Sequence, residues 1–232
     1  MKKNLRSALF LVSALIAFIP SLQVKAAVIT EAEETDIKGD SVFNARYVFA
    51  NLHTTALEIL PASIRLDLLD YWDVDSIYKA SNVLGGISWI EQLTDSYAKI
   101  QISPVSNLQI KILPDKKGKL AMTIYTVGDD PQAADSEVRF YDEGLSQLPV
   151  EKYLTVPPVK DFFEIPKGSA TKMKEIEEMI PFPTIAYTAF PDNDNLSARL
   201  TVEQFINRDD WNIAKLFLKP SFIMEWKKNR YK

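Results

Sequence analysis

Alternating apolar and polar residues dominate the chain between Asp95 and Tyr141 and predict the centre of the fold. Aliphatic residues occupy every second position in four consecutive runs, and short turns at residues 103–107 and 114–118, which carry Pro, Asn, Asp or Gly, separate the first three. Because successive side chains of a strand point to opposite faces, each run has one apolar and one polar face. The pattern predicts an antiparallel sheet with one face on a hydrophobic core and the other in water.

Helical periodicity precedes this predicted sheet. Apolar residues recur every three to four positions in residues 42–56, with Asp40 or Ser41 as the expected N-cap, and again in residues 61–72, which begin with a proline. Two short helices are therefore expected to pack on the apolar face of the sheet. Gly85-Gly86 lies between two β-capable runs and predicts a hairpin at the start of the sheet, because glycine accepts positive φ.

Residues 166–232 predict a second strand-rich unit. Tyr125-Thr126 recurs as Tyr187-Thr188 at an offset of 62 residues, and strands and polar turns follow both copies in the same order. We interpret this similarity as a degenerate internal duplication. A short amphipathic helix is expected at residues 169–180, between the copies, and a solvated basic tail at residues 227–230, after a closing strand.

The first 40 residues differ in composition from the rest. Residues 1–26 combine a basic start, an apolar run too short to span a bilayer with ease and a small-residue cleavage site, which is the layout of a signal peptide. Residues 27–40 are acidic and lack apolar periodicity, which favours a flexible lead-in. We expect an exported protein, periplasmic or secreted, of α+β class: an N-terminal helical pair on a largely antiparallel sheet at residues 41–165, completed by the second unit at residues 166–232.

Charge and cysteine content narrow the possible partners. The chain has 27 basic and 31 acidic residues, a net charge of −4, and no cysteine. Loss of the four basic residues of the predicted leader changes the net charge to −8, which argues against nucleic acid and anionic membranes as partners, because both need clustered positive charge. Disulfides and a thiol nucleophile are excluded, so the fold depends on core burial. No membrane span is expected after signal cleavage.

Signatures of catalysis are sparse. His53 is the single histidine, and the chain contains no Gly-x-Ser-x-Gly, no phosphate-binding glycine loop and no His-Glu-x-x-His. One histidine without cysteine is a poor start for a zinc site. Carboxylate pairs remain, because a glycoside hydrolase needs two acids at a suitable separation, but acidic clusters are common in a chain with 31 acids. No catalytic residue is singled out, and no cofactor is expected.

Aromatic residues at predicted strand and helix positions suggest binding. Trp89, Tyr125, Tyr187 and Trp211 can line a groove for a sugar or a peptide if they share the wet face of the sheet. Packing in the core or between neighbouring strands is the alternative interpretation of the same residues. These four are the candidate binding residues.

One acidic turn has the composition of a cation site. Asp192 and Asp194 alternate with asparagines, as oxygen ligands do in a calcium loop. The turn lacks the following glycine and the distal glutamate of an EF-hand, so a turn stabilised by Asp and Asn side chains is favoured. Asp192 and Asp194 are the candidate metal ligands under the calcium hypothesis.

Short segments between about Phe49 and Trp226 form a recognisable series. In chain order they are Leu60-Pro61, Arg65–Tyr71, Asn82–Gly86, Leu93–Tyr97, Lys111–Pro114, Tyr125–Val127 and Asp135–Tyr141. Their order and spacing resemble a secreted bacterial family known only as a domain of unknown function. The resemblance implies an α+β domain exported by a Gram-negative, gut-commensal kind of bacterium. It implies no catalytic residue, because the family has no assigned activity.

Two functional interpretations follow. The leading one is a non-enzymatic binding or interaction module of the cell envelope, whose partner is an envelope protein, a peptide or a glycan. The alternative is a carboxylate-dependent hydrolase that acts on glycans. Two acids that face each other across a cleft favour the hydrolase, whereas a flat aromatic face without such a pair favours binding.

Overall fold

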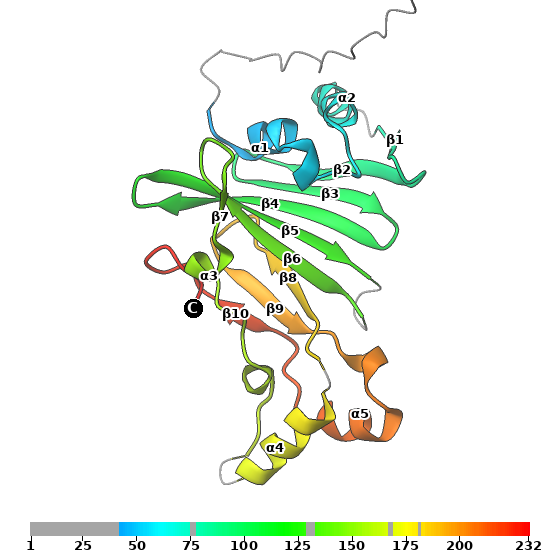
Figure 1. Ribbon diagram of the computed structural model, residues 1–232, viewed down its shortest axis with the longest axis vertical. Helices are drawn as coiled ribbons and strands as arrows, with labels where there is room; N and C mark the ends of the chain where they lie inside the picture. Colours follow the sequence, from blue (N-terminus) through cyan, green and yellow to red (C-terminus); the bar gives the residue numbers. More distant parts are fainter. Residues whose placement is uncertain (1–41, 75–77, 129–132, 167–168, 181) are drawn as a thin grey trace, which may run out of the picture. The chain divides into compact units, whose positions relative to one another are not determined.

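The computed structural model describes residues 42–74, 78–128, 133–166, 169–180 and 182–232 (Figure 1). Asp40–Lys232 form one compact unit, which contains both strand-rich regions that the sequence predicts. The predicted signal peptide and acidic lead-in lie outside the described residues. Within the described ranges, no helix has both the length and the apolar character that crossing a membrane requires.

A seven-stranded antiparallel sheet forms the centre of the fold. Its strands lie in chain order: β1 (Ala80–Ser81), β2 (Ile87–Leu93), β3 (Tyr97–Ser103), β4 (Ser106–Asp115), β5 (Gly118–Val127), β6 (Asp135–Tyr141) and β7 (Gln147–Leu148). The turns between β3 and β4 and between β4 and β5 fall inside the two predicted turn regions. The antiparallel sheet predicted from the alternating residues is confirmed.

The predicted hairpin at Gly85-Gly86 joins β1 to β2. Gly85 has a φ of +76°, which explains the glycine at this position. The buried side chain of Asn82 fixes the turn: its oxygen accepts the N–H groups of Leu84 and Gly86, each at 3.0 Å, and its amide nitrogen donates to the carbonyl oxygen of Ile102 at 2.8 Å. The local turn is therefore tied to the neighbouring strand β3.

Two helices cover one face of the central sheet (Figure 1). They are α1 (Ala45–Asn51) and α2 (Ala62–Asp73), joined through the 3-10 turn η1 (Thr54–Ala56). The helical pair is thus confirmed, but α1 begins later than predicted. Its N-cap is Asn44, whose side chain accepts the N–H of Tyr47 at 2.8 Å, whereas the expected caps Asp40 and Ser41 lie outside the described residues.

The core beneath the helices is largely aliphatic. Phe49 of α1, Leu68 and Leu69 of α2 and the sheet residues Ile100 and Ile110 are all buried there. The interior of a helix satisfies its own backbone hydrogen bonds, so apolar side chains form most of its contact with the sheet. At the start of α1, the N–H of Ala45 also donates to the carbonyl oxygen of Asp95 at 2.9 Å. We call this region the helix-side core.

A three-stranded antiparallel sheet covers the opposite face of the central sheet (Figure 1). Its order is β10 (Phe222–Met224), β9 (Leu196–Leu200) and β8 (Ile185–Ala189), and β8 contacts β4, β5 and β6. The expectation that this face lies in water is therefore wrong along β4. Gln109 and Lys111 occupy polar positions of the alternating pattern in β4, yet they are only 4% and 3% exposed. We call the region between the two sheets the sheet-side core.

Strand β8 is attached to the central sheet by side chains. Three of its backbone N–H groups, at alternate positions, donate to side-chain oxygens of the central sheet: Ile185 to Asp135 at 3.1 Å, Tyr187 to Ser136 at 3.0 Å and Ala189 to Gln109 at 3.1 Å. These donors point away from the partner strand β9, and a buried backbone donor without an acceptor is costly. Gln109, the buried acceptor of the three, thus lies between the two sheets as a hydrogen-bond partner of an edge strand.

Shorter elements complete the fold. They are α3 (Val150–Tyr153), η2 (Val159–Phe162), α4 (Ala170–Met179), η3 (Glu203–Phe205) and α5 (Arg208–Ala214). Helix α4 agrees with the helix predicted at residues 169–180. The basic tail predicted at residues 227–230 instead forms a hairpin turn, because Trp226 and Tyr231 pair in an antiparallel bridge on either side of it.

The two copies of the proposed duplication differ in strand register. Tyr125 pairs with Glu137 across β5 and β6, whereas Tyr187 pairs with Ala198, one residue before the position that the 62-residue offset predicts. A shift of one residue turns a side chain to the other face of a strand. In addition, Tyr125 packs against the helix-side core, whereas Tyr187 lies in the sheet-side core. The second strand-rich unit is present, but its pairing does not support the duplication.

Candidate functional site

A pocket of about 240 Å³ lies between the segment that links α1 to α2 and the helix-side face of the central sheet. Leu52 and residues 55–59 line one side of it. The strand residues that line the other side are Leu108 of β4, Thr123 and Tyr125 of β5, and Glu137, Arg139 and Tyr141 of β6. We call it the Tyr125 pocket. Its size is below the roughly 300–1,000 Å³ typical of sites for drug-sized ligands, so it suits one small molecule.

The turn over the pocket has a fixed conformation. His53 caps the 3-10 turn η1: its ring nitrogen Nδ1 accepts the N–H of Thr55 at 3.3 Å and lies 2.8 Å from the Thr55 hydroxyl. Leu57 and Leu60, which follow this turn, are buried in the helix-side core. The segment is therefore held at both ends while Thr55 and Glu58 line the pocket.

An ion pair with two hydrogen bonds lies in the pocket wall. The Nε and Nη2 atoms of Arg139 donate to the two carboxylate oxygens of Glu137 at 2.8 and 2.9 Å. The hydrogen bond that Arg139 donates to Glu137 raises the pKa of Arg139, burial opposes this rise, and a smaller effect of Tyr141 also raises it. The guanidinium is thus charged and oriented, and its remaining N–H groups are suitable donors to a ligand oxygen.

Tyr125 is the one predicted aromatic residue among the residues that line this pocket. Trp89 lies on the opposite face of the sheet, because it alternates along β2 with Ile90 of the helix-side core, and the ammonium of Lys79 lies 4.8 Å from its ring centroid. Tyr187 is buried in the sheet-side core, and Trp211 of α5 packs against that core. The structure does not bring the four residues together in one groove.

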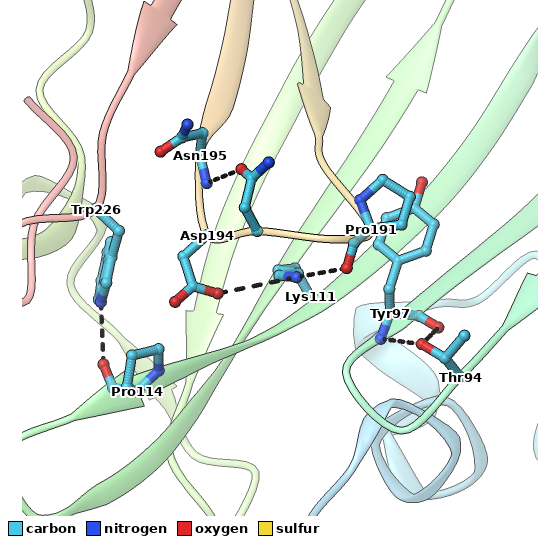
Figure 2. A network of polar contacts seen from close by, with 9 residues as sticks. Thr94, Tyr97, Lys111, Pro114, Pro191, Asp194, Asn195 and Trp226 are labelled. Atoms are coloured by element: carbon cyan, nitrogen blue, oxygen red, sulfur yellow. Dashed lines mark hydrogen bonds and ion pairs between the residues drawn. The ribbon is translucent and has the colours of Figure 1, made fainter.

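The side chain of Lys111 contacts the turn that carries the predicted calcium ligands (Figure 2). The buried ammonium of Lys111 donates to the carbonyl oxygen of Pro191 at 3.0 Å and lies 3.8 Å from the carboxylate of Asp194. Burial lowers the pKa of Lys111, and the charges of Asp194 and Asp192 oppose this effect. In the structure, the positive charge beside these two aspartates therefore comes from the protein itself.

The same turn has the geometry that its composition favours. The N–H of Asn195 donates to the side-chain oxygen of Asn193 at 2.9 Å, which is the hydrogen bond of an Asx turn (Figure 2). Across the part of the chain that the structure describes, no three His, Asp or Glu side chains are grouped so that they could hold a metal ion.

Two carboxylates line the Tyr125 pocket within the described residues, Glu58 and Glu137. Glu137 is bound by Arg139 and its side chain is 58% exposed, and Glu58 is exposed as well. A general acid must hold a proton near neutral pH, which burial or a neighbouring negative charge can arrange. Among the described residues, neither of the two carboxylates that line the pocket is buried.

Sequence reasoning missed the Glu137–Arg139 pair, although the sequence contains a signal for it. Residues two apart in a strand point to the same face, so an acid and a base at this spacing can form an ion pair beside Tyr125, which is directly opposite Glu137 in the neighbouring strand. No pattern in the sequence predicts that the segment between α1 and α2 lines this pocket, because its position depends on how it folds over the sheet.

Comparisons with known proteins identify a family and a shared fold. The family described as "Protein of unknown function (DUF3256)" matches residues 42–231. No curated protein matches the sequence. Among solved structures, the chain is similar to a domain of an uncharacterized protein from Porphyromonas gingivalis W83, with 22% identity and a TM-score of 0.67 over 81% of this chain and 96% of that chain. At this identity the similarity shows the α+β fold alone.

Proposed function

Since the chain belongs to the family described as "Protein of unknown function (DUF3256)", a description that names no activity, we propose a function from the geometry of the molecule. The protein is a non-enzymatic binding module that takes a small hydroxylated ligand, such as one sugar ring of a glycan, in the Tyr125 pocket. The observation that carries this proposal is that Tyr125 and the Glu137–Arg139 pair line the same pocket of about 240 Å³.

The chemistry of the pocket supports a sugar. A sugar ring has apolar C–H faces, which pack on an aromatic ring, and hydroxyl groups, which both donate and accept hydrogen bonds. Tyr125 and Leu108 supply apolar surface, while Glu137 supplies acceptors and Arg139 supplies donors. A fixed ion pair that offers both kinds of partner suits a neutral ligand with many hydroxyls.

The composition of residues 1–26 supports a location outside the cytoplasm. We propose that the module acts in the cell envelope or in the medium, where glycans are abundant ligands. The family resemblance of the sequence agrees with export.

The alternative function, a glycan hydrolase, uses the same pocket but has weaker support. Its two carboxylates are Glu58 and Glu137, and neither has the burial that keeps a general acid protonated. A binding protein leaves its ligand intact, whereas a hydrolase releases a shorter glycan, so product analysis separates the two.

The test is a glycan array followed by calorimetric titration of the strongest hits. Tyr125→Ala and Arg139→Gln are each expected to weaken binding about tenfold or more, which corresponds to roughly 1.4 kcal/mol. Trp89→Ala is the matched control, because this half-buried aromatic residue lies on the other face of the sheet. The affinity of this variant for the glycan should equal that of the unmodified protein. No binding to any glycan, or an equal loss in all three variants, contradicts the proposal, and turnover of a bound glycan favours the hydrolase.

A further inference from the structure

A second hollow, of about 310 Å³, lies between residues 155–161 and the C-terminal hairpin. Its walls are mostly apolar and come from Val156, Pro157, Pro158, Phe222 and Met224. The charged side chains that line it are Arg230, Lys232 and Asp161. We call it the Arg230 hollow, and it shares no lining residue with the Tyr125 pocket.

The C-terminal hairpin fixes the position of Arg230. Lys227 and Arg230 exchange two backbone N–H···O hydrogen bonds, of 2.9 and 3.2 Å, around a two-residue turn. The turn residues Lys228 and Asn229 have φ values of +52° and +61°, the positive values of a type I′ turn. This turn suits a tight hairpin, so Arg230 extends from defined backbone.

The hairpin is anchored to the sheet-side core by aromatic rings. Trp226 and Tyr231 lie opposite each other with ring centroids 4.9 Å apart, and the indole N–H of Trp226 donates to the carbonyl oxygen of Pro114 at 3.0 Å (Figure 2). The backbone N–H of Tyr231 donates to the carbonyl oxygen of Tyr153 at 2.8 Å. Tyr231 is buried, and it lines the hollow together with its neighbours Arg230 and Lys232.

The charges around the hollow are unbalanced. Among the described residues, neither Arg230 nor Lys232 has a carboxylate within ion-pair distance; the guanidinium of Arg230 contacts the hydroxyl of Thr155. A third cation is close, because the ammonium of Lys219 donates to the main-chain oxygen of Asp161 at 2.9 Å. Among the side chains that line the hollow, Arg230 and Lys232 are basic and Asp161 is acidic, so these side chains carry one net positive charge in a protein whose net charge is negative.

We propose that the Arg230 hollow binds a small organic anion with an apolar body, such as a medium-chain carboxylate. The apolar walls remove the chain of such a molecule from water, and the guanidinium of Arg230 offers paired N–H donors that match the geometry of a carboxylate. Lys232, whose side chain is exposed, adds attraction at the rim. Tight binding therefore requires both the apolar body of the ligand, which contacts the walls, and its carboxylate, which contacts Arg230.

Octanoate is the probe for this proposal, titrated into the intact protein by calorimetry below its micelle concentration. We expect saturable binding of octanoate, and binding of octanol and of inorganic phosphate that is weaker by about tenfold or more, because each lacks one half of the recognition. Octanol that binds as tightly as octanoate contradicts the selection for an anion. Absence of saturation up to millimolar octanoate overturns the proposal as a whole.

Substitutions assign the binding to the hollow. Arg230→Gln should weaken octanoate about tenfold or more, since hydrogen bonds to charged groups contribute about 1.5–3 kcal/mol, and Arg230→Lys should retain part of the affinity. Lys227→Gln is the matched control: it removes the same charge from the same hairpin, at a residue that pairs with Glu225 and does not line the hollow. Equal octanoate affinity in Arg230→Gln and Lys227→Gln contradicts the site, provided that both variants melt at the same temperature. Tyr125→Ala should leave octanoate binding unchanged, so this test is independent of the Tyr125 pocket.

Discussion

The two faces of the seven-stranded sheet are buried by different kinds of cover. On the helix side, α1 and α2 bring apolar side chains to the sheet and form most of their backbone hydrogen bonds within the helices. The N–H of Ala45, at the start of α1, is an exception, because it donates to the carbonyl oxygen of Asp95. On the sheet side, β8 brings three backbone N–H groups that its own partner strand does not bind, and Asp135, Ser136 and Gln109 accept them. An edge strand therefore needs polar residues in the surface on which it packs.

This difference changes the meaning of a polar residue in a strand. The same alternation of Ile110 with Gln109 and Lys111 fits a strand with one wet face, and it also fits a strand covered on both faces, where the polar residues bind a second sheet. The two cases differ in what the polar side chain contacts, which the sequence of the strand itself does not contain.

The largest expected effect tests whether both cores belong to one cooperative structure. Ile110 and Ile124 lie on neighbouring strands and are fully buried, the first in the helix-side core and the second in the sheet-side core. Truncation of either to alanine should cost about 2–5 kcal/mol of unfolding free energy, from lost burial and the cavity left behind. Urea unfolding followed by circular dichroism and tryptophan fluorescence should give one shared transition for each variant. Two separate transitions indicate that the cores unfold independently.

Alkaline pH should act on the sheet-side core. Burial raises the pKa of Tyr97 to about 12, with a smaller contribution from Glu91, and burial together with Asp135 raises that of Tyr187 to about 12. Between pH 10 and 12 the unfolded chain releases these protons while the folded protein keeps them, so stability falls as the pH rises, by up to about 3 kcal/mol per tyrosine. The measurement is the urea midpoint across this range, together with tyrosinate absorbance.

Tyr187→Phe sharpens the alkaline test. The hydroxyl of Tyr187 is buried without a hydrogen-bond partner among the described residues, so its removal breaks no hydrogen bond that the structure contains. We expect stability at pH 7 to be equal or higher and the decline above pH 10 to be shallower than in the unmodified protein. An unchanged alkaline slope shows that Tyr187 does not titrate as the buried position implies.

The attachment of β8 should have a smaller effect. Gln109→Leu keeps the volume but removes the acceptor of the Ala189 N–H, at a cost of about 1–3 kcal/mol for that buried donor alone. It also removes the acceptor of the Tyr97 hydroxyl and a donor to the carbonyl oxygen of Tyr187, which adds to this cost. Gln101→Leu is the control, because this half-buried glutamine points to the same face from the neighbouring strand and bonds to Ser103 instead of β8. Hydrogen exchange of the Ala189 amide should accelerate in the first variant alone. Unchanged protection of that amide contradicts the anchoring role of Gln109.

Local patterns predicted the central sheet and its helical cover, because the spacing of apolar residues within one segment determines both. Contacts between distant segments were not predictable in this way. Gln109 meets the Ala189 N–H from 80 positions away, and the polar pattern of β4 does not identify that partner. The same holds for the candidate site. Tyr125 was predicted from its residue type, whereas the position of the segment between α1 and α2, which encloses the pocket, was not predicted.

The smallest expected effect concerns the ion pairs of the two faces. Between α1 and α2, Arg46 forms two hydrogen bonds with Asp73, of 2.7 and 2.6 Å, but these side chains are 37% and 53% exposed. Water screens such a pair, so a double-mutant cycle of Arg46→Gln and Asp73→Asn should give a coupling energy of about 0.2–1 kcal/mol that decreases with added salt. On the sheet side, Lys111 is 3% exposed and lies 3.8 Å from the carboxylate of Asp194, which is 42% exposed, so the coupling energy of that pair should decrease less with added salt. Equal salt sensitivity of the two cycles contradicts the distinction drawn between the two faces.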